Sequence, residues 1–197
     1  MMTAQDAHGQ VACLLVQVDE VSPPIQRRVL VPFAMRMDDL HFVLQIAIGW
    51  QNCHPFEFEA GGKAWGLVDR ESAVNPLPAE SVTLADIAQL GRTFRYSYVF
   101  GEDWQHQLTI EYVTDAKPGE IYPQLLEAQG RCPPADIGGP EGYDHYLQAL
   151  RDSEHWHHEA MVEWDDPNFD PEDPGLPTLQ SNLANLAKYI GRRKIVA

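Results

Sequence analysis

The sequence predicts a single α+β domain with a mainly antiparallel sheet, helices packed on one side of it and a helical C-terminal part. The chain has 197 residues, of which 44% are hydrophobic, so it is large enough to bury one core without a disulfide or a metal. Segments with strand-like alternation come first and are joined by short turns, and helical periodicity dominates the end. We expect residues 1–10 to be disordered, 11–177 to form the domain, and 178–197 to form a C-terminal helix with a basic tail.

The first elements are two strands and a helix. Residues 11–19 and 25–31 are rich in β-branched side chains, and the prolines between them form a turn, so the two strands are predicted to pair antiparallel. Apolar residues recur at helical spacing from Leu40 to Ile48. This pattern predicts a helix that begins near Asp38 and ends at Gly49.

The middle of the chain is predicted to hold further strands, at 56–60, 63–68, 92–100 and 105–113. Thr83-x-x-Asp86 is a capping box that opens a short helix through Leu90. Prolines and glycines in residues 114–140 predict a long irregular connection.

Three helices are predicted after this connection. Residues 142–150 and 154–164 have helical spacing, and a proline-rich loop follows them. Thr178 can cap a last helix, which Gly191 ends. At helical spacing Asp152, His155, His158 and Glu159 would share one face, which is expected to be solvated rather than an adventitious metal site, with Trp156 and Trp164 on the buried side.

Charge is distributed unevenly along the sequence. There are 14 basic and 29 acidic residues, a net charge of −15. Residues 101–180 carry 3 basic and 18 acidic side chains, whereas residues 181–197 carry 4 and 0, including Arg192, Arg193 and Lys194. Because polyanion affinity comes from clustered Lys and Arg, nucleic acid is not expected as the primary ligand. The acidic stretch is either a solvated surface or a site for a cation or a basic partner.

The N-terminus lacks the basic and apolar regions of a signal peptide, and no apolar run reaches the length of a membrane helix. The three cysteines, Cys13, Cys53 and Cys132, are widely separated and form no Cys-x-x-Cys pair. The sequence therefore predicts a cytoplasmic protein with reduced thiols and no membrane partner.

Four segments together resemble the plasmid pRiA4b ORF-3-like family. In single-letter code they are PPIQRR at 23–28, GW at 49–50 followed by HPFEF at 54–58, YSYVFGEDWQH at 96–106, and CPPADIGGPEGY at 132–143. The resemblance implies a single α+β domain, often encoded on plasmids or mobile elements, with no established activity. Some members are labelled resolvases, but this chain has neither a nucleophilic Ser among arginines nor a basic DNA-binding segment.

Three positions depart from the family pattern. Gln26 stands where the family usually has Trp, Phe56 where it often has a second His, and Val99 where it often has Asp. If that His and Asp belong to a polar or metal site, this chain has lost two of its members.

One candidate metal site combines side chains around the predicted hairpin turn with a preceding loop. His54 and Glu57 are three residues apart, as are Asp103 and His106, and such side chains are ligands for Zn²⁺ or a similar ion. Glu102 lies in the same turn, and Cys132 and Asp136 are further candidate ligands. The alternative is structural: His106 packs with Trp104 and Asp103 hydrogen-bonds the turn backbone.

The loop from Cys132 to Gly139 could instead serve catalysis. Its prolines and glycines would hold Cys132 and Asp136 rigidly, with Cys132 as a nucleophile and a histidine such as His106 as base. The alternative is a structural loop that docks on the sheet, since no basic neighbour of Cys132 is evident. Arg27, Arg28, Arg92 and Arg95 are expected to form salt bridges with the acidic excess, because neighbouring strand residues point to opposite faces.

The function we predict is a non-enzymatic binding or interaction module with a protein or small-molecule partner and no cofactor. Its expected binding cleft is aromatic and lies between the hairpin and the Cys132 loop, formed by Trp50, Phe56, Tyr98, Phe100 and Trp104. Two alternatives stay open: a hydrolase that depends on a divalent metal or a cysteine, and an accessory factor associated with nucleic acid.

Overall fold

The computed structural model describes residues 7, 9–67, 75–98, 101–164, 166 and 168–196. In chain order the elements are β1 (Gln10–Val18), β2 (Gln26–Pro32), α1 (Met37–Ile48), β3 (Phe56–Ala60), β4 (Lys63–Gly66), β5 (Leu77–Pro78), the short 3-10 helix Ala79–Ser81, α2 (Leu84–Ala88), β6 (Thr93–Tyr98), β7 (Trp104–Asp115), β8 (Gln124–Gln129), α3 (Gly139–Arg151), α4 (His158–Trp164) and α5 (Leu176–Val196).

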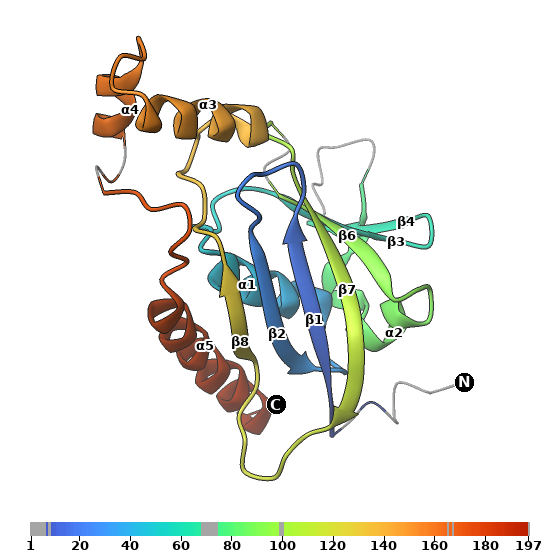
Figure 1. The fold of residues 1–197 in the computed structure, drawn as a ribbon. Helices are drawn as coiled ribbons and strands as arrows, with labels where there is room; N and C mark the ends of the chain where they lie inside the picture. Colours follow the sequence, from blue (N-terminus) through green and yellow to red (C-terminus); the bar gives the residue numbers. More distant parts are fainter. Residues whose placement is uncertain are drawn as a thin grey trace.

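The described strands form one open sheet of eight, in the order β5-β4-β3-β6-β7-β1-β2-β8. All neighbours pair antiparallel except β4 and β5, which are parallel. In Figure 1 α1 lies behind the middle strands, α5 runs beside β8, and α3 crosses one end of the sheet. The predicted single-domain α+β fold with a mainly antiparallel sheet is confirmed.

The main core lies between the sheet and the helices α1, α2 and α5. The central strands contribute alternate residues to it, such as Leu14 and Val16 of β1, because successive side chains of a strand point to opposite faces. Leu183 and Ala187 place α5 in this same core. None of the described helices combines the length and apolar composition needed to cross a membrane.

A smaller core lies at the end of the sheet beneath α3. Trp104 of β7 and Ile25, which directly precedes β2, pack there against Tyr143 and Leu147 of α3. Phe169 also joins this cluster. The second core therefore attaches α3 to the end of the sheet at which the β6–β7 hairpin turns.

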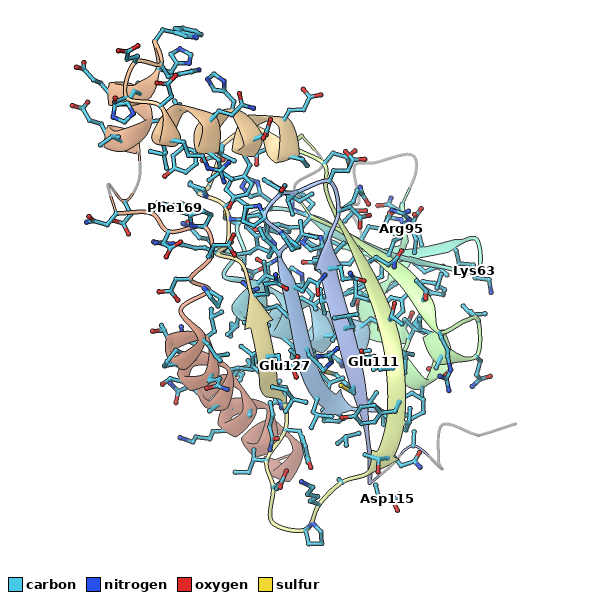
Figure 2. The ribbon with its side chains drawn as sticks, in the orientation of Figure 1. Lys63, Arg95, Glu111, Asp115, Glu127 and Phe169 are labelled. Atoms are coloured by element: carbon cyan, nitrogen blue, oxygen red, sulfur yellow. The ribbon has the colours of Figure 1, made fainter. Side chains whose placement is uncertain are left out.

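The opposite face of the sheet carries polar pairs. Arg28 bonds Glu111 at 2.6 Å and also pairs with Glu127 on the edge strand, and these two acids lie on neighbouring parts of one face in Figure 2. Arg95 pairs with Asp19 at 3.2 Å. The salt-bridge prediction is therefore right for Arg28 and Arg95.

Several predicted boundaries are wrong. Residues 114–140 are not wholly irregular, because β7 continues to Asp115 and β8 follows at Gln124–Gln129. As an edge strand β8 pairs with β2 alone, so it needs neither β-branched residues nor strict alternation, and its sequence gives a weak strand signal. The strand predicted over 63–68 ends at Gly66, and residue 68 lies outside the described residues.

The predicted helix at 154–164 is also only partly correct. Residues 152–157 form turns, in which Asp152 Oδ1 accepts from Glu154 N, a local bond that competes with helix formation. Its Trp156 side chain is 79% exposed, not buried, and the side chain of Trp164 lies outside the described set. The last helix starts before Thr178 and continues past Gly191 to Val196.

Candidate functional site

A small pocket lies where α1, the β6–β7 hairpin and the loop after β8 meet. We call it the Trp50 pocket, and its lining residues are Gly49, Trp50, Gln51, Cys53, His54, Tyr98, Glu102, Trp104, Pro133, Ala135 and Asp136. Its volume is about 40 Å³, enough for one water-sized group, since a water molecule occupies roughly 30 Å³ of the liquid.

Gly49 brings Trp50 to this pocket by ending α1 in the left-handed conformation, with φ of 113°. A Cβ on Gly49 would lie 2.9 Å from the Cβ of Cys132, so a larger residue would push the two segments apart. The close approach and the positive φ both require glycine here. Local sequence thus places the turn after α1 directly against the Cys132 loop.

Three of the five aromatic residues predicted for the cleft line the Trp50 pocket. The Trp50 ring centroid lies 5.2 Å from that of Trp104 and 5.7 Å from that of Tyr98. Phe56 does not line it, because its ring stacks on buried His41 at 3.7 Å in the main core. Phe100 lies outside the described residues.

His106 lies behind the pocket wall and is fully buried. Its Nδ1 donates to the Tyr96 carbonyl at 3.0 Å, and its Nε2 accepts from Trp50 Nε1 at 3.2 Å. Burial lowers the pKa of His106 to about 4, which keeps the ring neutral at pH 7. Because both nitrogens are already bonded, His106 orients Trp50 and has no free lone pair for a metal or a proton-transfer role.

The other candidate metal ligands do not gather around His106. Asp103 adopts φ of 57° in the hairpin turn, and its carboxylate accepts from Gln105 at 2.6 Å. Glu57 lies on β3, where burial raises its pKa, and it does not line the Trp50 pocket. No group of three or more His, Cys, Asp or Glu side chains within the described parts of the chain is arranged to hold a metal ion. The structure therefore does not assemble the predicted quartet.

Glu102 attaches the Cys132 loop to the hairpin. One carboxylate oxygen accepts from Trp104 Nε1 at 2.9 Å, and the other accepts from Gly138 N at 3.0 Å. Gly139 follows with φ of 73°, and a Cβ there would overlap the carbonyl oxygen of Glu102. This carboxylate thus fixes the loop that forms one wall of the pocket.

The two loop residues proposed for catalysis lie in different surroundings. Asp136 has its side chain 76% exposed at the pocket, with Oδ1 4.0 Å from His54 Nε2. Cys132 is partly buried against Gly49 and does not line the pocket. The three proposed catalytic residues Cys132, Asp136 and His106 therefore do not share one cavity.

Arg27, which lies beside the site, does not form the salt bridge that the sequence predicts for it. It forms no ion pair with a described residue, and all five of its N–H groups donate to backbone carbonyls of Gln26, Ala47, Ile48, Gln129 and Gly130. Two of these carbonyls belong to the end of α1 and two to the chain just before Cys132. The available signal was its position between inward-facing Ile25 and Val29 on an alternating strand.

A second buried network fixes the segment between α1 and β3. His41 Nε2 donates to Asn52 Oδ1 at 2.6 Å, and Tyr96 OH lies 2.8 Å from both His41 Nδ1 and Gln45 Nε2. Burial lowers the pKa of His41 to about 4. This network holds the backbone at Asn52, next to Cys53 and His54 of the pocket.

The four segments that carried the family resemblance converge at this end of the sheet. Arg27 joins the first segment to the end of α1, Trp50 joins the second to His106, and Glu102 joins the third to Gly138. The model for plasmid pRiA4b ORF-3-like protein matches residues 10–176. The chain belongs to this family.

One relative in sequence and one solved structure support the assignment to this family. The chain is 43% identical over 158 residues to the uncharacterized protein y4hQ of Sinorhizobium fredii, which covers 79% of this chain and 81% of that protein. The crystal structure of MM3350, a protein of unknown function from Methanosarcina mazei, matches with a TM-score of 0.76 at 32% identity. That match covers 84% of this chain and 96% of MM3350.

Two of the three departures from the pRiA4b ORF-3-like pattern lie among the described residues, and neither lines the Trp50 pocket. Phe56 packs in the core on His41, and Gln26 begins β2. Val99 lies outside the described residues. The Phe56 and Gln26 changes therefore leave the lining of the pocket intact.

Proposed function

We propose that this pRiA4b ORF-3-like protein is a non-enzymatic interaction module that takes a primary ammonium group of a basic partner into the Trp50 pocket. The observation that carries the proposal is the combination of aromatic walls and carboxylates around a space of about 40 Å³. Trp50, Tyr98 and Trp104 supply aromatic side chains to the lining, and aromatic rings attract cations, while Glu102 and Asp136 add negative charge. A lysine head group is close to water in size.

The charge of the chain supports a basic partner. The hairpin turn and the Cys132 loop both belong to residues 101–180, which carry 3 basic and 18 acidic side chains. A surface of one sign raises the local concentration of oppositely charged partners and speeds their association. The same charge disfavours a nucleic-acid partner.

Support for binding over hydrolysis comes from the bonds inside the site. His106 uses both ring nitrogens, and the pocket does not reach Cys132. All three cysteines are free thiols, which suits a cytoplasmic location.

The test is a titration of the labelled protein with n-butylammonium, followed by the indole N–H signals of Trp50 and Trp104 in NMR spectra. We expect saturable shifts with n-butylammonium and none with butanol or butyrate at equal concentration. Asp136→Asn should weaken binding by a few-fold, because an exposed carboxylate contributes up to about 1 kcal/mol. Asp144→Asn, an exposed acid on α3 outside the pocket, is the matched control and should change nothing.

Two results would overturn the proposal. Equal shifts with all three ligands would mean that the charge is not recognised. No shift of either indole signal up to the solubility of the salt would mean that the pocket holds only water.

A further inference from the structure

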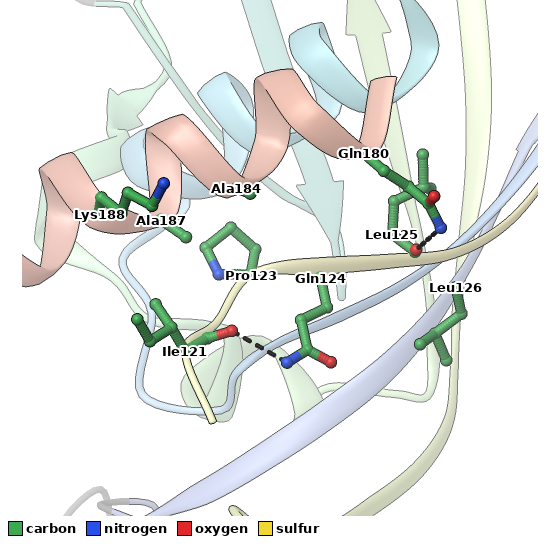
Figure 3. Close-up of a pocket in the computed structure, with 9 residues that line it drawn as sticks. All are labelled: Ile121, Pro123, Gln124, Leu125, Leu126, Gln180, Ala184, Ala187 and Lys188. Carbon is green, nitrogen blue, oxygen red and sulfur yellow. Dashed lines mark hydrogen bonds between the residues drawn. The ribbon is translucent and has the colours of Figure 1, made fainter. Parts of the chain in front are cut away.

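A larger groove lies between the edge strand β8 and helix α5, away from the Trp50 pocket (Figure 3). Its volume is about 350 Å³, within the range of roughly 300–1,000 Å³ typical of ligand pockets. The lining residues are mostly apolar side chains from the two elements and from the loop before β8. This groove has no counterpart among the sequence predictions.

The apolar wall of the groove is exposed where a ligand would lie. Ile121 is 57% exposed and Leu126 is 37% exposed, although both are large aliphatic residues. Ala184 and Ala187 on α5 are small, so the helix leaves room opposite them, as Figure 3 shows. An exposed apolar strip of this kind gains free energy when an alkyl chain covers it.

Charge at the groove has the opposite sign to the rest of the protein. Lys188 is the charged residue among those that line it, and among the described residues it forms no ion pair. Residues 181–197 carry 4 basic and no acidic side chains in a chain of net charge −15. The nearest acid before β8, Glu120, is already paired with Lys117 and bonded by Tyr122. The groove therefore offers an anion one available cation at its edge.

Two backbone carbonyls at the groove already accept side-chain hydrogen bonds, which disfavours a peptide that would add a strand to β8 there. Gln180 of α5 donates to the Leu125 carbonyl of β8 at 3.0 Å, and Gln124 donates to the Ile121 carbonyl at 3.0 Å (Figure 3). A peptide that added a strand to β8 would need free main-chain acceptors such as these. An alkyl chain needs none.

We infer that the groove between β8 and α5 is a binding site for a medium-chain alkyl carboxylate, with the chain on the apolar wall and the carboxylate on Lys188. This site is independent of the proposed ammonium pocket, because no residue lines both. It gives the protein a small anionic ligand as well as a basic partner.

The experiment is isothermal titration calorimetry of the full chain with decanoate below its micelle concentration. Octanoate should bind more weakly, by up to about fifteen-fold, since two buried methylenes are worth roughly 0.8 kcal/mol each. Lys188→Gln should weaken the binding of decanoate by up to about five-fold, as expected for an exposed ion pair, and leave the binding of decanol unchanged. Ala184→Trp should abolish binding by filling the groove, while its exposed neighbour Asn185→Trp, which does not line it, should not.

The inference is overturned by no binding of decanoate, by equally tight binding to Ala184→Trp, or by binding no tighter than that of decylammonium, because each result removes the groove or its charge from the interaction. A doubled mass in sedimentation that Ala184→Trp reduces to the monomer would assign the groove to a second copy of the chain instead. Far-ultraviolet circular dichroism of each variant separates lost binding from lost folding.

Discussion

Arg27 offers the sharpest test of how this fold is held together, because one side chain joins two segments of the site. Its side chain is 1% exposed, and four of its five N–H donors reach carbonyls at the end of α1 and at or just after the end of β8. Arg27→Met keeps a long side chain on β2 but removes every donor. We expect a large loss of stability centred on the junction between α1 and the Cys132 loop.

The magnitude follows from the bonds that are fully buried. Those to Ala47 O, Ile48 O and Gly130 O lie out of contact with water, and a buried acceptor left without a donor costs about 1–3 kcal/mol. The three bonds together therefore imply a loss of about 3–9 kcal/mol. Removing a buried cation also removes its desolvation cost of several kcal/mol, so we expect a net loss of about 3 kcal/mol. Arg27→Lys should cost less, because an ammonium group retains three donors.

The assay is urea unfolding at pH 7, followed by circular dichroism and by tryptophan fluorescence. The control is Arg28→Met, one residue along, whose ion pair with Glu111 is only partly buried and whose ion pair with Glu127 is exposed, so that the two together should be worth about 1 kcal/mol. A loss below about 1 kcal/mol for Arg27→Met, or an equal loss for Arg28→Met, would refute the argument that buried carbonyls need this guanidinium.

Three more predictions concern the loss of stability at low pH, the contact of Gly139 with Glu102, and the capping box of α2. Burial lowers the pKa of His41 and of His106 to about 4, so between pH 6.5 and pH 4 the unfolded chain binds protons that the folded chain does not. The free energy of unfolding should therefore fall as the pH drops from 6.5 to 4, by up to about 3 kcal/mol per histidine. A series of urea titrations at different pH values measures this fall. Gly139→Ala should lower the melting temperature by an amount equivalent to about 2 kcal/mol or more, because its Cβ would strike the Glu102 carbonyl at a positive φ. Thr83→Ala should cost about 1 kcal/mol in urea unfolding, since it removes the capping box of α2.

Each of these has a matched control. His41→Gln should remove about one proton from the pH dependence, and an unchanged slope would contradict the assignment of His41. Gly119→Ala keeps a positive φ but meets no atom within 4 Å, so a loss equal to that of Gly139→Ala would show that the Glu102 contact is unimportant. Ser81→Ala, whose exposed hydroxyl donates to the Pro78 carbonyl, should have little effect compared with Thr83→Ala.

The elements that the sequence predicts correctly are those whose structure is decided by local chemistry. The capping box at Thr83 is present with both of its reciprocal hydrogen bonds, because cap and N3 residues lie within one turn of each other. Among the strands of the N-terminal pair and of the β6–β7 hairpin, β2 and β7 are the most predictable, because their alternation of buried and more exposed residues persists over seven or more positions. Gly49 ends α1 as expected.

The failures concern residues whose role is set by distant partners. β8 forms because β2 offers it an edge and α5 packs on its Leu125, and neither contact can be recognised from residues 124–129 alone. Arg27 was expected to pair with acids, yet its partners are carbonyls, which every residue has and no sequence pattern marks. The spacing of His54, Glu57, Asp103 and His106 predicts a metal site, but spacing along the sequence contains neither the geometry of the hairpin nor the burial of His106, which together keep these side chains apart.

The distribution of charge determines how the two proposed sites would act together. The Trp50 pocket lies by the end of β8 that leads to Cys132, and the groove lies by the end that follows Ile121; a six-residue strand separates them by roughly 20 Å. At physiological salt the Debye length is about 8 Å, so an anion in the groove would not neutralise the acidic surface at the pocket. Binding of butylammonium and decanoate should therefore be additive in free energy, and it should become antagonistic or cooperative only if a packed element transmits the effect. α1 touches both regions, through Gly49 at the pocket and through its packing on α5, which makes it the element to examine if coupling is found.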